Sequence, residues 1–405
     1  MTRPFEKDAT LSGAPEKKRS AGLNYAGYPL RLVMAAAAAM LVYFSADSHI
    51  LKNWNTEESL VVEAVDVGET RVTSDEDQGD RNPFRTMETE LALLLLTGEK
   101  RGQTFNIVVT QMEGSGIEFG RGGRYILLFD AFDGGAVQYS IADAYRVPSV
   151  VGFIVFICGA LMALAGRSGV RALAGLLLSI IILLWGYIPL VASGKPPMPL
   201  AFLAVLLIAA VTVFSVVRRK QARLVALLGT LGGAAGAFAL GCLMVMLWRL
   251  TGLSAENAAL LATTMPGIDI RGILLSSVII SAIGAVLDVG ISITASMSEL
   301  VEYDPAIPPL TLWTSGIRVG GEVLGSMINT LILAYLGTSL PIAILICNAG
   351  PSWIGLLNDP YVGQEILQSL AGTSGLLLTI PITATLFVFQ EKLFRRAVEE
   401  NAENG

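Results

Sequence analysis

The sequence is poor in the residues on which many enzymes and secreted proteins depend. Its 405 residues include one histidine, His49, which argues against catalytic triads, histidine metal sites and histidine proton relays. The three cysteines, Cys158, Cys242 and Cys347, lie far apart in apolar segments and show neither a disulfide framework nor a metal-ligand spacing. The sequence therefore predicts no cofactor and assigns no metal site.

Charged residues are also scarce. They make up 15% of the chain, whereas a soluble protein carries about a quarter. Hydrophobic residues make up 53%, and the mean hydropathy is +0.61. This composition predicts a mainly α-helical polytopic membrane protein whose first partner is the lipid bilayer. We expect no nucleic-acid partner.

The N-terminal segment has a polar and an apolar part. Residues 1–28 contain "APEKKRS" and no apolar run, so we predict a disordered cytoplasmic tail. Residues 29–46 are apolar and follow several basic residues. Because no small-residue cleavage site follows them, we interpret them as a first transmembrane helix and not as a signal peptide.

Residues 47–147 have the pattern of a small extracytoplasmic β domain. Short hydrophobic runs are separated by breaks such as "TGEKRGQ" and "EFGRGGR", which carry turn residues. Five strands in about 100 residues fit a small closed barrel, of which the OB-fold is one candidate, or an open sandwich. The predicted strands are Leu60–Val67, Glu88–Leu96, Thr104–Gln111, Arg124–Phe132 and Ala136–Ala142.

The same region is acidic, with 18 Asp and Glu residues against 9 Lys and Arg residues in 47–147. An acidic exterior domain can concentrate cations at the mouth of a pore. An ordinary solvated surface has this composition too, so both interpretations stay open.

Apolar segments recur over residues 148–392, which we predict to be a transmembrane helical domain. With 29–46 they make about eight spanning helices. Basic residues cluster at alternate turnarounds, so the positive-inside rule places both termini, including the tail 393–405, in the cytoplasm and the β domain outside. The predicted spans are 149–166, 170–192, 198–217, 222–250, 272–297, 319–336 and 371–390.

The apolar stretch "SLPIAILICNAGP", near residues 338–352, is too short to cross a bilayer. We predict a broken or re-entrant segment, which a membrane tolerates only where protein or a water-filled cavity surrounds it. Pro341 and Asn348 in this segment are gate candidates. Asp269 and Arg271, at the predicted outer mouth, are either gate elements or interfacial anchors.

The stretch "AVLDVGISITASMSEL", residues 285–300, places a carboxylate inside an apolar helix. Asp288 is the only charged residue between Gly272 and Ser298. A carboxylate at the centre of a span costs about 2.5–3.5 kcal/mol on insertion scales. Helical spacing puts Ser292 on the same face. Asp288 therefore either lines an ion or substrate path or is a structural carboxylate held by hydroxyls, backbone amides or Arg318.

A second polar stripe lies in "SGIRVGGEVLGSMINTLILAYLG", residues 315–337. We expect the two stripes to bury against each other, so that coupling carboxylates lie between the sixth and seventh spans. The simpler alternatives are an i,i+4 ion pair and interhelical hydrogen bonding. The polar members of this stripe are Arg318, Glu322, Ser326 and Asn329.

Glycine-rich helix faces occur at 229–241 and 321–325. They permit close helix association, so a homo-oligomer is one expected state. No strand precedes the first of them, which excludes a nucleotide-binding loop.

The runs "GILLSSVIISAIGAVLDVGISI" and "GEVLGSMINTLILAYLGTSLP" resemble the YibE/F-like family of bacterial membrane proteins, as do "LTGEKRGQ" and "YSIADAYRVP". The resemblance covers roughly residues 50–390 and implies a polytopic inner-membrane protein with an N-terminal extracytoplasmic domain. By motif matching, it implies that Asp288, Ser292, Glu322 and Asn329 belong to the family's polar membrane core. It supplies no established activity, although it suggests a permease.

Three function classes follow. In the first, a transporter or permease, Asp288 and Glu322 bind a proton, a metal cation or a small amine-bearing solute. The second is a non-transporting scaffold whose β domain binds a partner. The third, an intramembrane aspartyl enzyme, is disfavoured because no second aspartate lies in another span, so we expect no enzymatic activity. We predict a transporter whose direction and cargo the sequence does not specify.

Overall fold

The computed structural model describes residues 33–43, 45, 59–73, 86–98, 100–112, 117–131, 137–217, 219–254, 257–350 and 352–403. The chain divides into two compact units, with the boundary between Gly166 and Arg167. The tail predicted over 1–28 lies outside the described residues.

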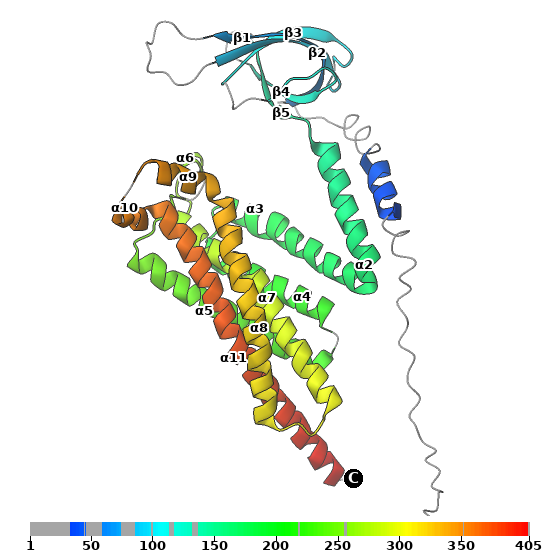
Figure 1. Cartoon of the computed structure of the whole chain (residues 1–405), viewed down its shortest axis with the longest axis vertical. Helices are drawn as coiled ribbons and strands as arrows, with labels where there is room; N and C mark the ends of the chain where they lie inside the picture. The colour runs from blue at the N-terminus through cyan, green and yellow to red at the C-terminus, as the bar shows by residue number, and fades with distance from the viewer. Residues whose placement is uncertain are drawn as a thin grey trace, which may run out of the picture. The chain divides into compact units, whose positions relative to one another are not determined.

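The first unit contains an antiparallel sheet of five strands in the order β3-β2-β1-β4-β5 (Figure 1). β1 pairs with β2 on one side and, through its first residues, with β4 on the other. The five predicted strands are thus confirmed. They are β1 (Ser59–Thr73), β2 (Thr86–Leu95), β3 (Thr104–Met112), β4 (Arg124–Ala131) and β5 (Val137–Ala144).

Alternate residues of the strands form the core of this sheet, as a period of two requires. Val62 and Ala64 of β1 are buried, and alternate positions of β2 and β4 join them. Two register shifts in β1, one of them between Ala64 and Asp66, interrupt its pairing with β2, and such bulges bend a strand. The rings of Phe105 in β3 and Tyr139 in β5 have centroids 5.6 Å apart, so the two edge strands approach each other.

Two helices complete the first unit. Helix Val33–Tyr43 packs against the first part of α2 (Val147–Ile181), where Gly152 and Gly159 permit the close approach. A Cβ atom at Gly159 would lie only 2.8 Å from the Cβ atom of Ala35. α2 is interrupted at Gly166, whose φ of 55° and ψ of −134° are not helical.

Among the residues that the structure describes, seven helices are long and apolar enough to cross a membrane, and each coincides with a predicted span. Of the span predicted over 29–46, the structure describes the helix Val33–Tyr43, so the total of eight stays a prediction. The seven are Val147–Gly166, Ser168–Ala192 (the end of α2, the π-helix η3 at Ile182–Tyr187, and α3 at Ile188–Ala192), α4 (Pro197–Val216), α5 (Lys220–Leu247), α7 (Ile270–Tyr303), α8 (Pro309–Thr338) and Pro360–Arg396 within α11 (Pro360–Glu403).

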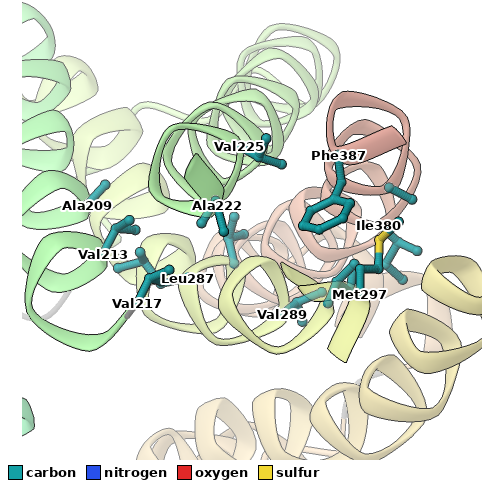
Figure 2. Close-up of a cluster of buried hydrophobic side chains, with 14 of the residues drawn as sticks. Ala209, Val213, Val217, Ala222, Val225, Leu287, Val289, Met297, Ile380 and Phe387 are labelled. Carbon is teal, nitrogen blue, oxygen red and sulfur yellow. The ribbon is translucent and has the colours of Figure 1, made fainter. Parts of the chain in front are cut away.

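α7 is the central helix of the second unit, and 67% of its most apolar stretch of 18 residues is buried. Apolar side chains of α4, α5, α7 and α11 meet in one core (Figure 2). Glycine brings three of these helices together, because a Cβ atom at Gly233 of α5 would lie 2.8 Å from the carbonyl oxygen of Gly375 in α11 and 2.9 Å from Val286 in α7. The glycine-rich face of 229–241 is therefore used within the chain.

The segment after α8 is broken, as predicted. α9 (Leu340–Asn348) has 9 residues and α10 (Trp353–Asn358) has 6, and Gly350 between them has a left-handed φ of 64°. Neither helix reaches spanning length. Figure 1 shows α9, α10 and the short α6 (Ala258–Thr264) at one end of the second unit and the C-terminus at the other. α11 continues to Glu403, so most of the segment predicted as a tail is helical.

Candidate functional site

Asp288 lies near the middle of α7, as the nineteenth of its 34 residues. Most apolar side chains of this helix are buried against α4, α5 and α11, whereas Asp288 and Gly284 are exposed. The helical period separates the two groups, because positions three and four apart share one face. The exposed face of α7 is therefore its polar face.

This face borders a cavity of about 670 Å³ inside the second unit. Its walls come from the residues 172–183 of α2 and η3, from the second half of α4 and from residues 280–292 of α7. Most of the lining is aliphatic. The polar groups in it are Ser179, Thr212, Ser281, Asp288 and Ser292.

Two of the hydroxyl groups donate a hydrogen bond to a backbone carbonyl of their own helix. Ser179 donates to the carbonyl oxygen of Gly175 at 2.9 Å, and Ser281 donates to that of Val278 at 3.1 Å. A hydroxyl that donates to its own helix keeps its lone pairs available as acceptors. Both side chains can therefore accept a hydrogen bond from a solute or contribute an oxygen ligand to a cation.

Asp288 makes no hydrogen bond and no ion pair with any residue that the structure describes. The interpretation of Asp288 as a structural carboxylate held by serine hydroxyls, backbone amides or Arg318 finds no support in these contacts. Its carboxylate is available to whatever enters the cavity.

The expectation that the two polar stripes face each other is wrong. α8 contacts α7 and α11 through Gly316 and Gly320, and a Cβ atom at Gly320 would meet Ile293 and Ile380 at 3.0 Å and below. The polar stripe lies on the opposite side of α8, where Arg318, Glu322, Ser326 and Asn329 are all exposed. None of them lines the cavity beside Asp288.

The glycines explain this outcome. α8 approaches its neighbours most closely where it has no side chains, and the helical period then directs the polar stripe outward. Nor do Arg318 and Glu322 form the alternative i,i+4 ion pair among the described contacts.

The four gate candidates lie at helix ends. Asp269 is the N-cap of α7, where its carboxylate accepts a hydrogen bond from the backbone N–H of Gly272 at 2.8 Å. Arg271 is exposed in the first turn of the same helix. Pro341 stands in the first turn of α9, and Asn348 is its last residue. A capping role accounts for Asp269 without a gate.

Sequence reasoning missed the walls contributed by α2, η3 and α4. The sequence signal that could have identified these walls is the pair Gly175 and Ser179, which lie four residues apart in a strongly apolar span. Thr212 in the next span adds to it. π-helical turns occur frequently at functional sites, but the sequence does not reveal that η3 is one. Leu183 of η3 lines the cavity.

A family model for the YibE/F-like protein matches residues 153–392, which is more than half of the chain. The chain belongs to the YibE/F-like family. No curated protein and no solved structure matches it significantly. The match begins within α2, after the five strands of the first unit, so the resemblance of the ectodomain segments stays a prediction.

The matched region of this YibE/F-like protein contains the whole cavity and the whole polar stripe of α8. Among the described residues, no group of three or more His, Cys, Asp or Glu side chains is arranged to hold a metal ion. What the cavity offers is one unpaired carboxylate, several hydroxyl oxygens and apolar walls. This combination suits a small cationic solute, a single cation or a proton.

Proposed function

We propose that this YibE/F-like protein is a membrane transporter or permease that moves an ion or a small solute across the bacterial cytoplasmic membrane. The observation that carries the proposal is the cavity beside Asp288, since an unpaired carboxylate at the centre of an apolar helix is costly and is retained chiefly where it has a function. Asp288 is the coupling carboxylate in this proposal, and Glu322 is not part of the cavity.

The chemistry of the walls limits the solute. Hydroxyl and carboxylate oxygens are ligands for hard cations, and the aliphatic walls accept the carbon skeleton of an amine. A carboxylate that releases a proton when the cation binds couples the two fluxes, because one site cannot hold both charges at once. The proposal therefore is an exchange of a cation or an amine-bearing solute for a proton.

The proposed topology has both termini in the cytoplasm and the strands of the first unit outside. Eight spans would return the chain to the side on which it started, and the basic residues near Arg171, Arg219 and Lys392 would lie on that side. The strand order and the approach of β3 to β5 support an OB-like barrel for the exterior domain. The broken segment with Pro341 and Asn348 remains the proposed gate, together with Arg271.

Asp288→Asn is the test. In proteoliposomes we expect the variant to lose proton-coupled flux of Na⁺, K⁺, Mg²⁺, Mn²⁺ or a small amine, whichever of these the unchanged protein moves, because the amide has no charge to exchange. The readout is a pH-sensitive dye inside the vesicles. Glu302→Gln, an exposed acid near the end of the same helix, is the matched control and retains flux. Unchanged flux in Asp288→Asn contradicts the proposal.

The alternative function is a membrane scaffold whose exterior domain binds a partner. The observation in its favour is the separate hydrophobic core of the sheet, which lies outside the region matched by the family model. A stoichiometric partner that co-purifies with the protein, combined with the absence of flux for all of the probes above, would favour this alternative.

A further inference from the structure

The outward face of α8 is unlike the surface of an ordinary lipid-facing helix. Only 6% of the most apolar stretch of 18 residues in α8 is buried. A lipid-facing surface is expected to be aliphatic, yet the exposed side of α8 carries two charges, an amide, a hydroxyl and two glycines. These residues are Arg318, Gly321, Glu322, Gly325, Ser326 and Asn329, and we call them the α8 polar face.

The two charges lie well inside the helix. Arg318 is the tenth and Glu322 the fourteenth of its 30 residues, which places them about 14 Å and 20 Å from its start at 1.5 Å per residue. Neither side chain has an ion pair or a hydrogen bond with any residue described in the structure. Glu322 lies within the predicted span 319–336, and Arg318 directly precedes that span. Charged groups inside a span face a bundle interior or a water-filled cavity and not lipid. Something must therefore cover the α8 polar face.

The apolar helices of the first unit do not provide the missing charges. Helix Val33–Tyr43 and the span Val147–Gly166 contain no charged residue at all. An occupant of the α8 polar face has to bring an acid for Arg318 and a base for Glu322, at neighbouring levels of the membrane. A second copy of α8 brings both.

We infer that the protein is a dimer in the membrane and that the α8 polar faces of two copies pack against each other. Copies of one chain insert with the same orientation, so a two-fold axis along the membrane normal relates them and the contact is isologous. Arg318 of one copy then lies one helical turn from the level of Glu322 of the other, within reach of its long side chain. The interface therefore contains two pairs of Arg318 with Glu322, one on each side of the axis.

The two glycines fit this arrangement. A Cβ atom at Gly321 or at Gly325 would have no neighbour within 4 Å in one chain, so both positions are open. Glycines four residues apart let two membrane helices approach closely, and Ser326 and Asn329 can then form hydrogen bonds across the contact. The glycines at Gly316 and Gly320 serve the packing within one chain, and Gly321 and Gly325 would serve the packing between chains.

Complementary charge variants test the inference independently of transport. Two copies with different affinity tags are co-expressed, and the recovery of one tag with the other is measured in lipid nanodiscs. The Arg318→Glu chain carries two acids on the α8 polar face, and the Glu322→Arg chain carries two bases. We expect each variant to recover its own kind at least about tenfold less than the unchanged protein does, because like charges would meet.

The decisive sample contains both variants. An acidic face and a basic face are complementary, so the Arg318→Glu chain recovers the Glu322→Arg chain at the level of the unchanged protein. An ion pair within one chain predicts no such restoration. Lys392→Glu, an equal charge change at an exposed position of α11, is the control and leaves self-recovery intact.

The glycines provide a second measurement without a charge change. In Gly321→Leu/Gly325→Leu we expect the protein mass in a nanodisc to fall from two chains to the 42.9 kDa of one. Both positions are open in the single chain, so folding should tolerate the leucines. Failure of the mixed variants to pair, a single-chain mass for the unchanged protein, or a different protein bound at one copy per chain would each overturn the inference.

Discussion

Asp269 satisfies one of the backbone N–H groups that the start of α7 leaves unpaired. Its negative charge also interacts favourably with the positive end of the helix dipole. The sequence makes the same residue a gate candidate. The two roles have different requirements, since a cap needs a side-chain oxygen and a gate that attracts cations needs the charge.

We predict that Asp269→Ala lowers the free energy of unfolding by about 0.5–2 kcal/mol, because it removes the cap. Asp269→Asn keeps an oxygen acceptor and should melt within a few degrees of the unchanged protein. Thermal unfolding in detergent, followed by circular dichroism, measures both. Glu302→Ala, at the other end of α7, is the control. Equal loss of flux in the alanine and asparagine variants, without a change in melting, would assign Asp269 to a gate instead.

Asp288 shows how far a single residue can be interpreted from sequence. A lone carboxylate in a long apolar run is conspicuous because its insertion cost is high. The groups that share its cavity, such as Gly175, Ser179 and Thr212, carry no such signal, because small and hydroxyl-bearing residues are common in spanning helices. Which helix lies opposite Asp288 depends on packing and not on the residues of α7 alone.

At the scale of the elements, hydropathy and alternation predicted what each segment is. The spans follow from segment length against bilayer thickness, and the strands follow from alternation and turn residues. The side of α8 that packs against the other helices could not be predicted in this way. The helical period identifies which residues share a side of α8, and the glycine pairs Gly316/Gly320 and Gly321/Gly325 give two sides on which close packing is feasible. Packing within the chain uses the side that carries Gly316 and Gly320.

Gly284 permits a direct test of the cavity as an element of the site. A Cβ atom there would have no neighbour within 4 Å, although the residue lines the cavity. We predict that the side chain in Gly284→Leu fills part of the cavity and lowers flux at least tenfold. The variant should stay folded, because leucine favours a helix more than glycine does. Vesicle flux and thermal unfolding measure the two effects.

Gly337→Leu is the matched control for that variant. Gly337 is likewise helical, with open space around it, and it lines none of the described cavities. Flux should stay within twofold of the unchanged protein. If both leucine variants lose flux equally, the cavity is not the route.

At the scale of the whole molecule, the sheet of the first unit has a core of its own, built from β1, β2 and β4. We predict that residues 47–146, produced without the helices, fold into a soluble domain. A strand-type circular dichroism spectrum and one cooperative transition in urea would confirm it. A gradual transition without a plateau would mean that the sheet depends on the helical part.

Acid should weaken this domain. Hydrogen bonds from Arg121 and from Arg146 hold the pKa of Asp66 and of Asp143 below the usual value of 3.8. The folded state thus binds fewer protons, and the contribution of both pairs is present above pH about 4 and is lost as the pH falls through the lowered pKa values. In urea titrations of Asp66→Asn/Asp143→Asn, the midpoint should depend less on pH below 4.

Gly166 separates two helices that its neighbours in sequence would otherwise join. Its backbone angles, φ 55° and ψ −134°, suit glycine alone, and they interrupt the hydrogen-bond ladder between the spans Val147–Gly166 and Ser168–Ala192. The spans Val147–Gly166 and Ser168–Ala192 are therefore two separate helices joined at one glycine. A side chain at this position would strain the turn, so the separation of the two spans depends on a single residue without a Cβ atom.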